Sequence, residues 1–267
     1  MFPNAATGRH LSMFCWDATR HQRPCGPQAI DVYNRAVATV SGTVMAQLQV
    51  AFPDSAATLL LPGPTGALEL AIDAPTPSGA RPALAIVCHP HPPEGGSMHN
   101  KVVTMAARAL RELGLTTLRF NFRGVGASEG KYDGGRGEVL DLLAVAQWTQ
   151  QQRPDQQLWL AGFSFGAWIA LLGARHLPIA QMISIAPPAG RWDFSAVLPP
   201  TCPWLVIQGE DDDIVDPQAV YDWLDKLDAH ATLVKMANTG HFFHRRLMDL
   251  RGAIKHGVRR SLPPPRV

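Results

Sequence analysis

The stretch LWLAGFSFGAWIALL, residues 158–172, decides the fold of this chain. Its first six residues are continuously apolar, which is typical of a strand that is buried on both faces. The turn GFSFG, residues 162–166, overlaps the end of this run, and an apolar helical pattern begins directly after Ser164. A serine at so sharp a strand-to-helix turn adopts a strained backbone conformation and projects its hydroxyl from the sheet. The stretch therefore predicts an α/β fold that carries a nucleophilic serine, although the same serine is also a possible helix N-cap.

Outward from this turn, apolar strand-like runs alternate with helical patterns along most of the chain. We predict strands at residues 58–61, 68–72, 83–88, 115–122, 158–163, 182–186, 204–208 and 232–235. We predict helices at residues 99–113, 138–152, 165–175, 217–228 and 243–258. The first two strands flank the turn sequence PGPTG and form a hairpin. This alternation predicts a mostly parallel sheet of about eight strands with helices on both faces.

The pattern also divides the chain into three parts. Residues 1–44 show no sustained period of 2 or 3.6, so we expect a poorly patterned N-terminal extension there. A second interpretation is that the natural protein starts at Met45. Residues 45–262 form the α/β domain, and a proline-rich tail occupies residues 263–267.

Composition excludes several classes of partner. The chain has 267 residues, with 24 Lys and Arg against 22 Asp and Glu, which gives a formal net charge of +2. So balanced a charge builds no basic face, so we expect neither nucleic acid nor a membrane as partner. No apolar run reaches the roughly 18 residues that a membrane-spanning helix requires.

The cysteines indicate the compartment. Cys15, Cys25, Cys88 and Cys202 form neither a CxxC pair nor a zinc-ligand spacing. The N-terminus also lacks the basic start and apolar stretch of a secretory signal. We therefore expect a cytoplasmic protein with reduced thiols, and no metal or cofactor.

A serine hydroxyl is a weak nucleophile and needs a base, which an acid in turn orients. At such a turn the partners follow in the chain order serine, acid, histidine. The predicted strand 204–208 leads into the acidic run EDDDIVD, and the strand 232–235 leads into Gly240-His241. Both ends lie on the same sheet edge as Ser164. We therefore expect Ser164 to attack, His241 to carry its proton, and Asp212 to fix the imidazole tautomer.

The acidic run leaves the identity of the acid open. The spacing G-x-x-D-x-x-V, from Gly209 to Val215, selects Asp212. Asp211 or Asp213 would take its place after a slip of one residue. Asp216 directly precedes a proline at the predicted helix start, which favours a helix cap.

A tetrahedral oxyanion requires two hydrogen-bond donors near the serine. One donor is expected from the amide of the residue after the nucleophile, Phe165, and the other from the loop HPHPPEGG after the strand 83–88. Pro90, Pro92 and Pro93 carry no amide hydrogen, so His91 is the expected donor in this loop. A weaker alternative makes His89, His91 and His99 metal ligands, but no carboxylate or cysteine lies at a matching spacing.

Several segments together resemble a known group of proteins. They are HPHPPEGGSMHNKVV at 89–103, RFNFRGVGASEG at 119–130, GFSFG at 162–166, SIAPPAGRWDF at 184–194, VIQGEDDDIVDPQ at 206–218 and TGHFFH at 239–244. Over residues 59–260 the chain resembles the α/β-hydrolase superfamily, and more closely its small lidless bacterial serine hydrolases related to dienelactone hydrolase. The resemblance implies the α/β-hydrolase fold and hydrolysis of carboxylic esters or thioesters through an acyl-enzyme. Dienelactone hydrolase itself has a cysteine where this chain has Ser164, so its substrate is not implied.

Lid domains of this superfamily enter after the strand predicted at 182–186. Here only residues 187–203 separate that strand from the next, which is too short for a helical cap. We therefore expect an open site without a cap domain, with Arg191, Trp192 and Phe194 as substrate contacts.

These observations favour a serine hydrolase acting on small or medium acyl substrates. Two other functions stay open, namely an amidase or peptidase with the same three residues, and a non-catalytic binding protein with the same fold.

Overall fold

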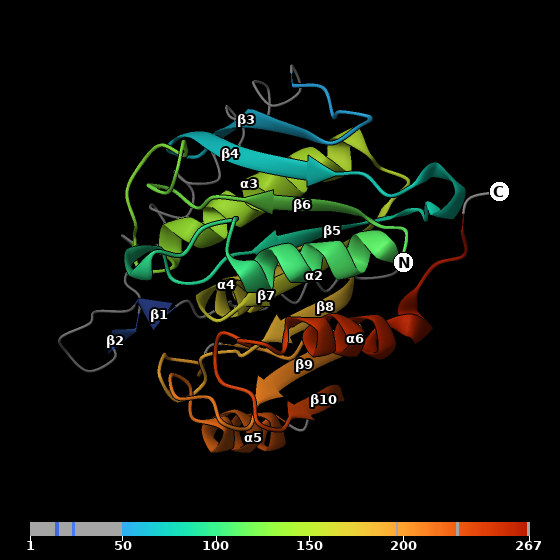
Figure 1. Cartoon of the computed structure of the whole chain (residues 1–267). Helices are drawn as coiled ribbons and strands as arrows, with labels where there is room; N and C mark the ends of the chain where they lie inside the picture. Colours follow the sequence, from blue (N-terminus) through green and yellow to red (C-terminus); the bar gives the residue numbers. More distant parts are fainter. Residues whose placement is uncertain (1–13, 16–22, 25–49, 196, 228–229, 266–267) are drawn as a thin grey trace, which may run out of the picture. The chain divides into compact units, whose positions relative to one another are not determined.

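Figure 1 shows the computed structural model of the chain, which describes residues 14–15, 23–24, 50–195, 197–227 and 230–265. The chain divides into two compact units, Met1–Gly42 and Thr43–Val267. In the first unit, β1 (Phe14–Cys15) and β2 (Arg23–Pro24) form an antiparallel pair. Apart from this pair, the predicted extension over residues 1–44 and the alternative start at Met45 lie outside the described residues.

The second unit is built on one sheet of eight strands. The strands are β3 (Ala57–Gly63), β4 (Gly66–Asp73), β5 (Ala83–Cys88), β6 (Thr116–Phe120), β7 (Gln157–Phe163), β8 (Ile179–Ile185), β9 (Trp204–Gly209) and β10 (Ala231–Met236). They lie in the order β10-β9-β8-β7-β5-β6-β4-β3. The β3–β4 and β4–β6 pairs are antiparallel, and all the others are parallel. The predicted mostly parallel sheet of about eight strands is confirmed.

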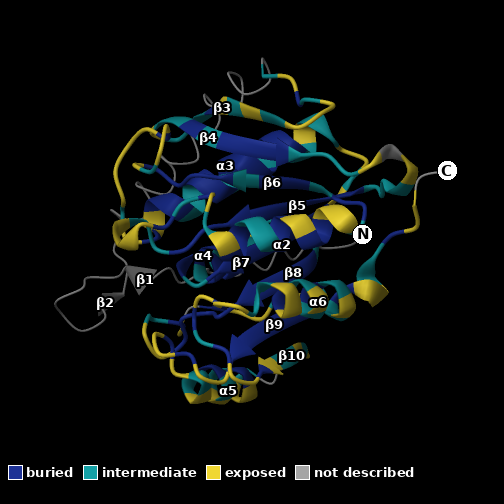
Figure 2. Cartoon of the chain, viewed as in Figure 1, coloured by how far each residue is buried: buried dark blue, intermediate teal, exposed yellow. Residues whose placement is uncertain are grey.

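Helices cover both faces of this sheet. They are α2 (Lys101–Glu112), α3 (Arg136–Gln152), α4 (Phe165–Ala174), α5 (Pro217–Lys226) and α6 (Leu247–Gly257), with short 3-10 turns at Pro77–Gly79, Pro92–Glu94 and Arg259–Ser261. One apolar cluster joins α2 and α6 to the sheet, and a second joins α3, α4 and α5 to its other face. Figure 2 shows the result, with buried central strands and exposed residues on the outer faces of the helices. None of the helices in the described part of the chain is both long and apolar enough to cross a bilayer.

The last helix starts later than the sequence predicts. Apolar periodicity suggested a helix over residues 243–258, whereas α6 begins at Leu247. Phe243 and Arg245 have φ angles of 51° and 61°, in the left-handed region that an α-helix does not use. The chain therefore turns irregularly after β10, and this turn carries His241.

The connection between β8 and β9 is short, as predicted. Its described residues form an isolated bridge between Ala189 and Trp192 but no helix. The carboxyl ends of β5, β7, β9 and β10 therefore lie along one sheet edge, and the described residues between β8 and β9 place no helical cap over it.

Candidate active site

The turn between β7 and α4 holds Ser164 in a strained conformation. Its φ and ψ angles are 53° and −122°, in a region that residues with a Cβ rarely adopt. The flanking glycines permit the close packing of this turn. A Cβ on Gly162 would lie 2.2 Å from the carbonyl oxygen of Gly166, and a Cβ on Gly166 would lie 2.4 Å from the carbonyl oxygen of Cys88. Both contacts are far below van der Waals distance, so neither position tolerates a side chain without rearrangement.

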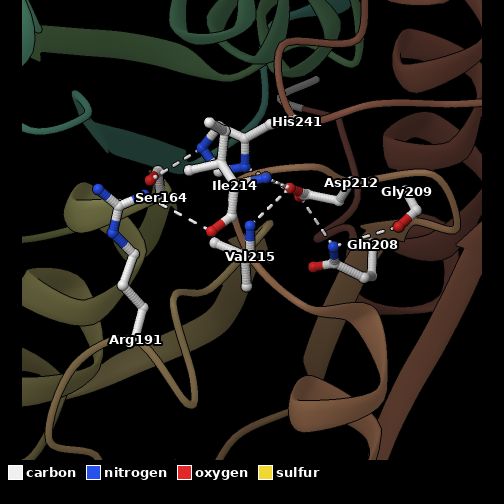
Figure 3. Close-up of polar contacts among 8 residues, drawn as sticks. All are labelled: Ser164, Arg191, Gln208, Gly209, Asp212, Ile214, Val215 and His241. Atoms are coloured by element: carbon white, nitrogen blue, oxygen red, sulfur yellow. Dashed lines mark hydrogen bonds and ion pairs between the residues drawn. The ribbon is translucent and has the colours of Figure 1, made fainter.

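The structure brings Ser164, His241 and Asp212 together from the ends of β7, β10 and β9 (Figure 3). The Nε2 atom of His241 lies 3.1 Å from the Oγ atom of Ser164. On the other side of the ring, Nδ1 lies 2.8 Å from Oδ2 of Asp212. The carboxylate accepts from Nδ1–H, and this tautomer leaves the lone pair of Nε2 directed at the serine hydroxyl. The arrangement can therefore move a proton from the hydroxyl to the imidazole.

Asp212 is held by four hydrogen bonds. Besides His241, its Oδ2 accepts from Nε2 of Gln208 at 2.9 Å, and its Oδ1 accepts from the amides of Ile214 at 3.0 Å and Val215 at 2.8 Å. Burial raises the pKa of Asp212, but the hydrogen bond and charge of His241 and the two amides outweigh it and lower the pKa below its usual value. The carboxylate is therefore ionised at neutral pH.

The neighbouring acids lie elsewhere. Asp211 and Asp213 are exposed, whereas Asp212 is buried. Asp216 caps α5, where its Oδ1 accepts from the amide of Gln218 at 3.0 Å. Of the acids in this run, Asp212 is therefore the one that lies beside His241, as the spacing from Gly209 to Val215 predicts.

Sequence reasoning missed Gln208. Its amide is fully buried at the end of β9 and donates to Asp212. The signal was present, because Gln208 is the one polar side chain in the apolar run WLVIQG. A polar residue in a strand buried on both faces needs a partner, and the carboxylate supplies it.

The two expected oxyanion donors lie on adjoining segments. Phe165 starts α4, and His91 precedes the 3-10 turn Pro92–Glu94 after β5. Their rings are 5.5 Å apart between centroids. Neither backbone amide donates a hydrogen bond within the described part of the chain. The Phe165 amide adjoins Ser164 in the chain, and both amides are available to a ligand oxygen.

The alternative of a histidine metal site does not fit the contacts. The Nδ1 atom of His89 contacts the carbonyl of Pro90 at 2.7 Å, and its Nε2 accepts from the amide of Phe122 at 3.0 Å. Both ring nitrogens of this buried residue are thus engaged in the fold. Among the described residues, no group of three or more His, Cys, Asp or Glu side chains is placed to hold a metal ion.

Of the three expected substrate contacts, two lie near the serine. Arg191 extends toward it in Figure 3, donating to Glu94 at 3.1 Å and to the carbonyl of Ile214 at 3.5 Å. The ring of Trp192 lies 4.7 Å from that of Phe165.

Phe194 is more deeply buried than the other two expected contacts. Its side chain is only 8% exposed, and its ring packs against Trp223 of α5 at 4.7 Å. An aromatic residue in a short loop packs over the core where a helix offers an apolar partner, and Phe194 does so here. Its role as a substrate contact stays a prediction.

Comparison with known proteins shows the family of this chain. Residues 85–251 match the family described as alpha/beta hydrolase domain. The uncharacterized protein RP471 of Rickettsia prowazekii is 40% identical over 202 residues, which cover 72% of this chain and 84% of that protein.

Solved structures extend the comparison. XC6422 from Xanthomonas campestris, described as an a/b serine hydrolase without lid, is 62% identical with a TM-score of 0.79 and covers 82% of this chain and all of its own. An alpha-beta serine hydrolase homologue from Coxiella burnetii is 42% identical with a TM-score of 0.75, covering 78% of this chain and all of its own. A dienelactone hydrolase from Anabaena variabilis, 18% identical with a TM-score of 0.66 over 78% of this chain and 98% of its own, shares the fold. The chain therefore belongs to the alpha/beta hydrolase family, among its lidless serine hydrolases.

Proposed function

We propose that this protein hydrolyses carboxylic esters or thioesters of small or medium acyl groups through an acyl-enzyme on Ser164. The observation that carries the proposal is the continuous contact from Ser164 through His241 to Asp212. A hydroxyl, an imidazole and a buried carboxylate in this order form the arrangement that activates serine in acyl transfer.

In the first half of the reaction, Oγ of Ser164 attacks the substrate carbonyl while Nε2 of His241 takes the hydroxyl proton. The carbonyl oxygen becomes an oxyanion, to which the amides of Phe165 and His91 donate. Asp212 stabilises the imidazolium that forms. When the tetrahedral species collapses, the bond to the leaving group breaks and the imidazolium protonates the departing alcohol or thiol.

Water completes the cycle. His241 removes a proton from a water molecule, and the resulting hydroxide attacks the acyl carbon. The acyl–Oγ bond then breaks, and the imidazolium returns its proton to Ser164. The products are a carboxylic acid and the regenerated enzyme, so no external oxidant, reductant or cofactor enters the balance.

We also propose a cytoplasmic location. Cys88 is buried, and burial raises the pKa of its thiol above the usual range. Cys202 is also a free thiol, and two free thiols are typical of a protein in a reducing compartment.

The test combines turnover with covalent labelling. We expect hydrolysis of p-nitrophenyl esters and acyl thioesters, and one fluorophosphonate label per chain on the peptide that contains Ser164. Ser164→Ala should lower kcat by about 10⁶ and abolish labelling. The matched control is Ser78→Ala, which removes an exposed serine of the 3-10 turn Pro77–Gly79 and should change neither.

The outcomes separate the alternatives. Equal turnover of p-nitrophenyl esters and of the matching anilides would instead indicate an amidase. Absence of both turnover and labelling in the unaltered protein would indicate a non-catalytic binding protein.

A further inference from the structure

The ring of His91 is enclosed by aromatic side chains. Ring centroids of Trp192, Tyr132 and Phe165 lie 5.1, 5.2 and 5.5 Å from its own. Within this enclosure its Nε2 atom lies 2.9 Å from the hydroxyl oxygen of Tyr132. The Nδ1 atom is buried and has no hydrogen-bond partner among the described residues. In that part of the chain, Tyr132 therefore supplies the only side-chain hydrogen bond of this ring.

The surrounding charges decide the direction of this hydrogen bond. A carboxylate oxygen of Glu94 lies 3.6 Å from Nδ1 of His91 and favours a proton on that nitrogen. The Nε2 lone pair then accepts from the hydroxyl of Tyr132. Burial lowers the pKa of His91, and burial also raises the pKa of Tyr132 to about 12. Both side chains are therefore neutral near pH 7, and the tyrosine keeps the proton that it donates.

The main chain of His91 lies in a tight turn. Its carbonyl accepts from the amides of Glu94 at 3.1 Å and Gly96 at 3.0 Å. A Cβ on Gly96 would lie 2.0 Å from the carbonyl oxygen of Pro90, so the turn closes on itself. The peptide plane that carries the His91 amide also carries the carbonyl of Pro90, whose oxygen lies 2.7 Å from Nδ1 of His89. The ring of His91 is the remaining part of this residue, and Tyr132 holds it.

We propose that Tyr132 is a positioning residue for catalysis: its hydroxyl holds the ring of His91 and, together with the contact of His89 on the Pro90 carbonyl, keeps the His91 amide directed at the oxyanion. This inference rests on the proposed function. Tyr132 follows β6 on a different loop, 41 residues from His91 in sequence. It therefore ties the loop after β5 to the loop after β6 next to the nucleophile.

The size of the effect follows from what the hydroxyl does. Without it, Nε2 of His91 loses its protein partner at a position open to solvent, and the ring is free to turn toward water. The amide shifts but is not removed. Complete loss of an oxyanion donor costs about 10²–10³ in kcat, so we expect a displaced donor to cost about tenfold. Substrate affinity should change little, because the oxyanion exists only after attack.

Tyr132→Phe tests the proposal, since it removes only the hydroxyl. We expect kcat to fall about tenfold and KM to stay within about twofold, and we expect an alkyl boronic acid, which forms a tetrahedral oxyanion on serine, to bind about tenfold more weakly. The control is Tyr221→Phe in α5, where the buried hydroxyl has no hydrogen-bond partner among the described residues. This control should leave kcat and boronate affinity unchanged.

A second measurement separates positioning from general damage. In a His91→Phe background the acceptor is absent, so Tyr132→Phe should then have no further effect on kcat. Equal tenfold losses in both backgrounds would overturn the proposal. So would an unchanged boronate affinity, or a rise in KM alone, which would make Tyr132 a substrate contact. These results all require an active parent enzyme, whereas failure of the proposed function would abolish activity and labelling in the parent itself.

Discussion

Replacing Asp212 with asparagine probes how the imidazole of His241 is held, because the surroundings dictate how the new amide lies. Two backbone amides, from Ile214 and Val215, donate to Oδ1 of Asp212. An amide NH₂ at that position would face two donors. The oxygen of the asparagine must therefore occupy the Oδ1 position, and its NH₂ group takes the place of Oδ2.

The NH₂ group then faces two side chains that donate to Oδ2 in the parent protein. Gln208 can rotate its own amide, because its Oε1 has no partner among the described residues, at the cost of its bond to the carbonyl of Gly209. His241 can avoid two facing donors only by accepting at Nδ1. Its proton then moves to Nε2, which lies 3.1 Å from Oγ of Ser164.

A protonated Nε2 cannot take the proton of the serine, so most of the catalytic power is lost. In a serine protease the equivalent change lowers kcat by about 10⁴, or about 5.5 kcal/mol in the activation barrier, while the geometry stays intact. We expect Asp212→Asn to behave likewise, with KM nearly unchanged. Steady-state hydrolysis of a p-nitrophenyl ester measures both constants.

The chain supplies matched controls on either side. Asp211→Asn and Asp213→Asn remove exposed carboxylates from the same run and should keep kcat within about threefold, as surface changes usually do. If Asp212→Asn retains more than a tenth of the parent kcat, the tautomer argument is wrong. If a neighbouring variant loses activity instead, a different acid orients the histidine.

Three further changes test strain and ionisation, each by urea unfolding. Ser164→Gly should be about 1–2 kcal/mol more stable than Ser164→Ala, because glycine adopts φ 53° without Cβ strain, and equal midpoints would refute this. Glu112 accepts hydrogen bonds from basic side chains of α2 and α6. These bonds, chiefly the one from Arg251, lower the pKa of Glu112 to about 2. Glu112→Gln should therefore lower the free energy of unfolding by about 1–2 kcal/mol above pH 4.5, and by progressively less as the pH falls toward 2. A difference between parent and variant that does not change with pH would contradict this expectation. Burial lowers the pKa of His89 from 6.5 to about 4. As the pH falls from 6.5 to 4, the unfolded chain therefore binds a proton at this residue before the folded chain does, and the free energy of unfolding decreases. His89→Gln should make the free energy of unfolding less dependent on pH in this range, and the same pH dependence in both proteins would argue against the assignment.

The fold was largely predictable because burial on both faces imposes unbroken apolar runs. The run at residues 83–88 coincides with β5, and the run at 158–163 starts one residue after β7 begins. The start of α6 was not predictable in this way. Phe243 lies four residues before Leu247, which fits the spacing of an apolar helix face. The left-handed conformations of Phe243 and Arg245 nevertheless keep this segment out of the helix, next to His241.

Some residues of the site were predictable from the sequence and others were not. Ser164 and His241 follow from a turn motif and from strand ends, whereas spacing favours Asp212 but leaves Asp211 and Asp213 open. Tyr132 left no signal, since it is an aromatic residue in the glycine-rich segment KYDGGRG whose partner lies 41 residues away. Loop composition does not say on which side an aromatic ring will pack, so the contact of Phe194 with Trp223 was not predictable.

The sequence by itself determined the strand–helix alternation, the nucleophile turn and the residues available for proton transfer, because each is encoded by neighbours along the chain. Only the tertiary structure decided which acid lies beside the histidine, that Gln208 supports it, and that Tyr132 reaches the loop after β5. These are contacts between segments that end at one sheet edge, and loop conformations set them. Hydrophobic periodicity specifies which strands are buried, but it carries no information about how the loops beyond those strands meet.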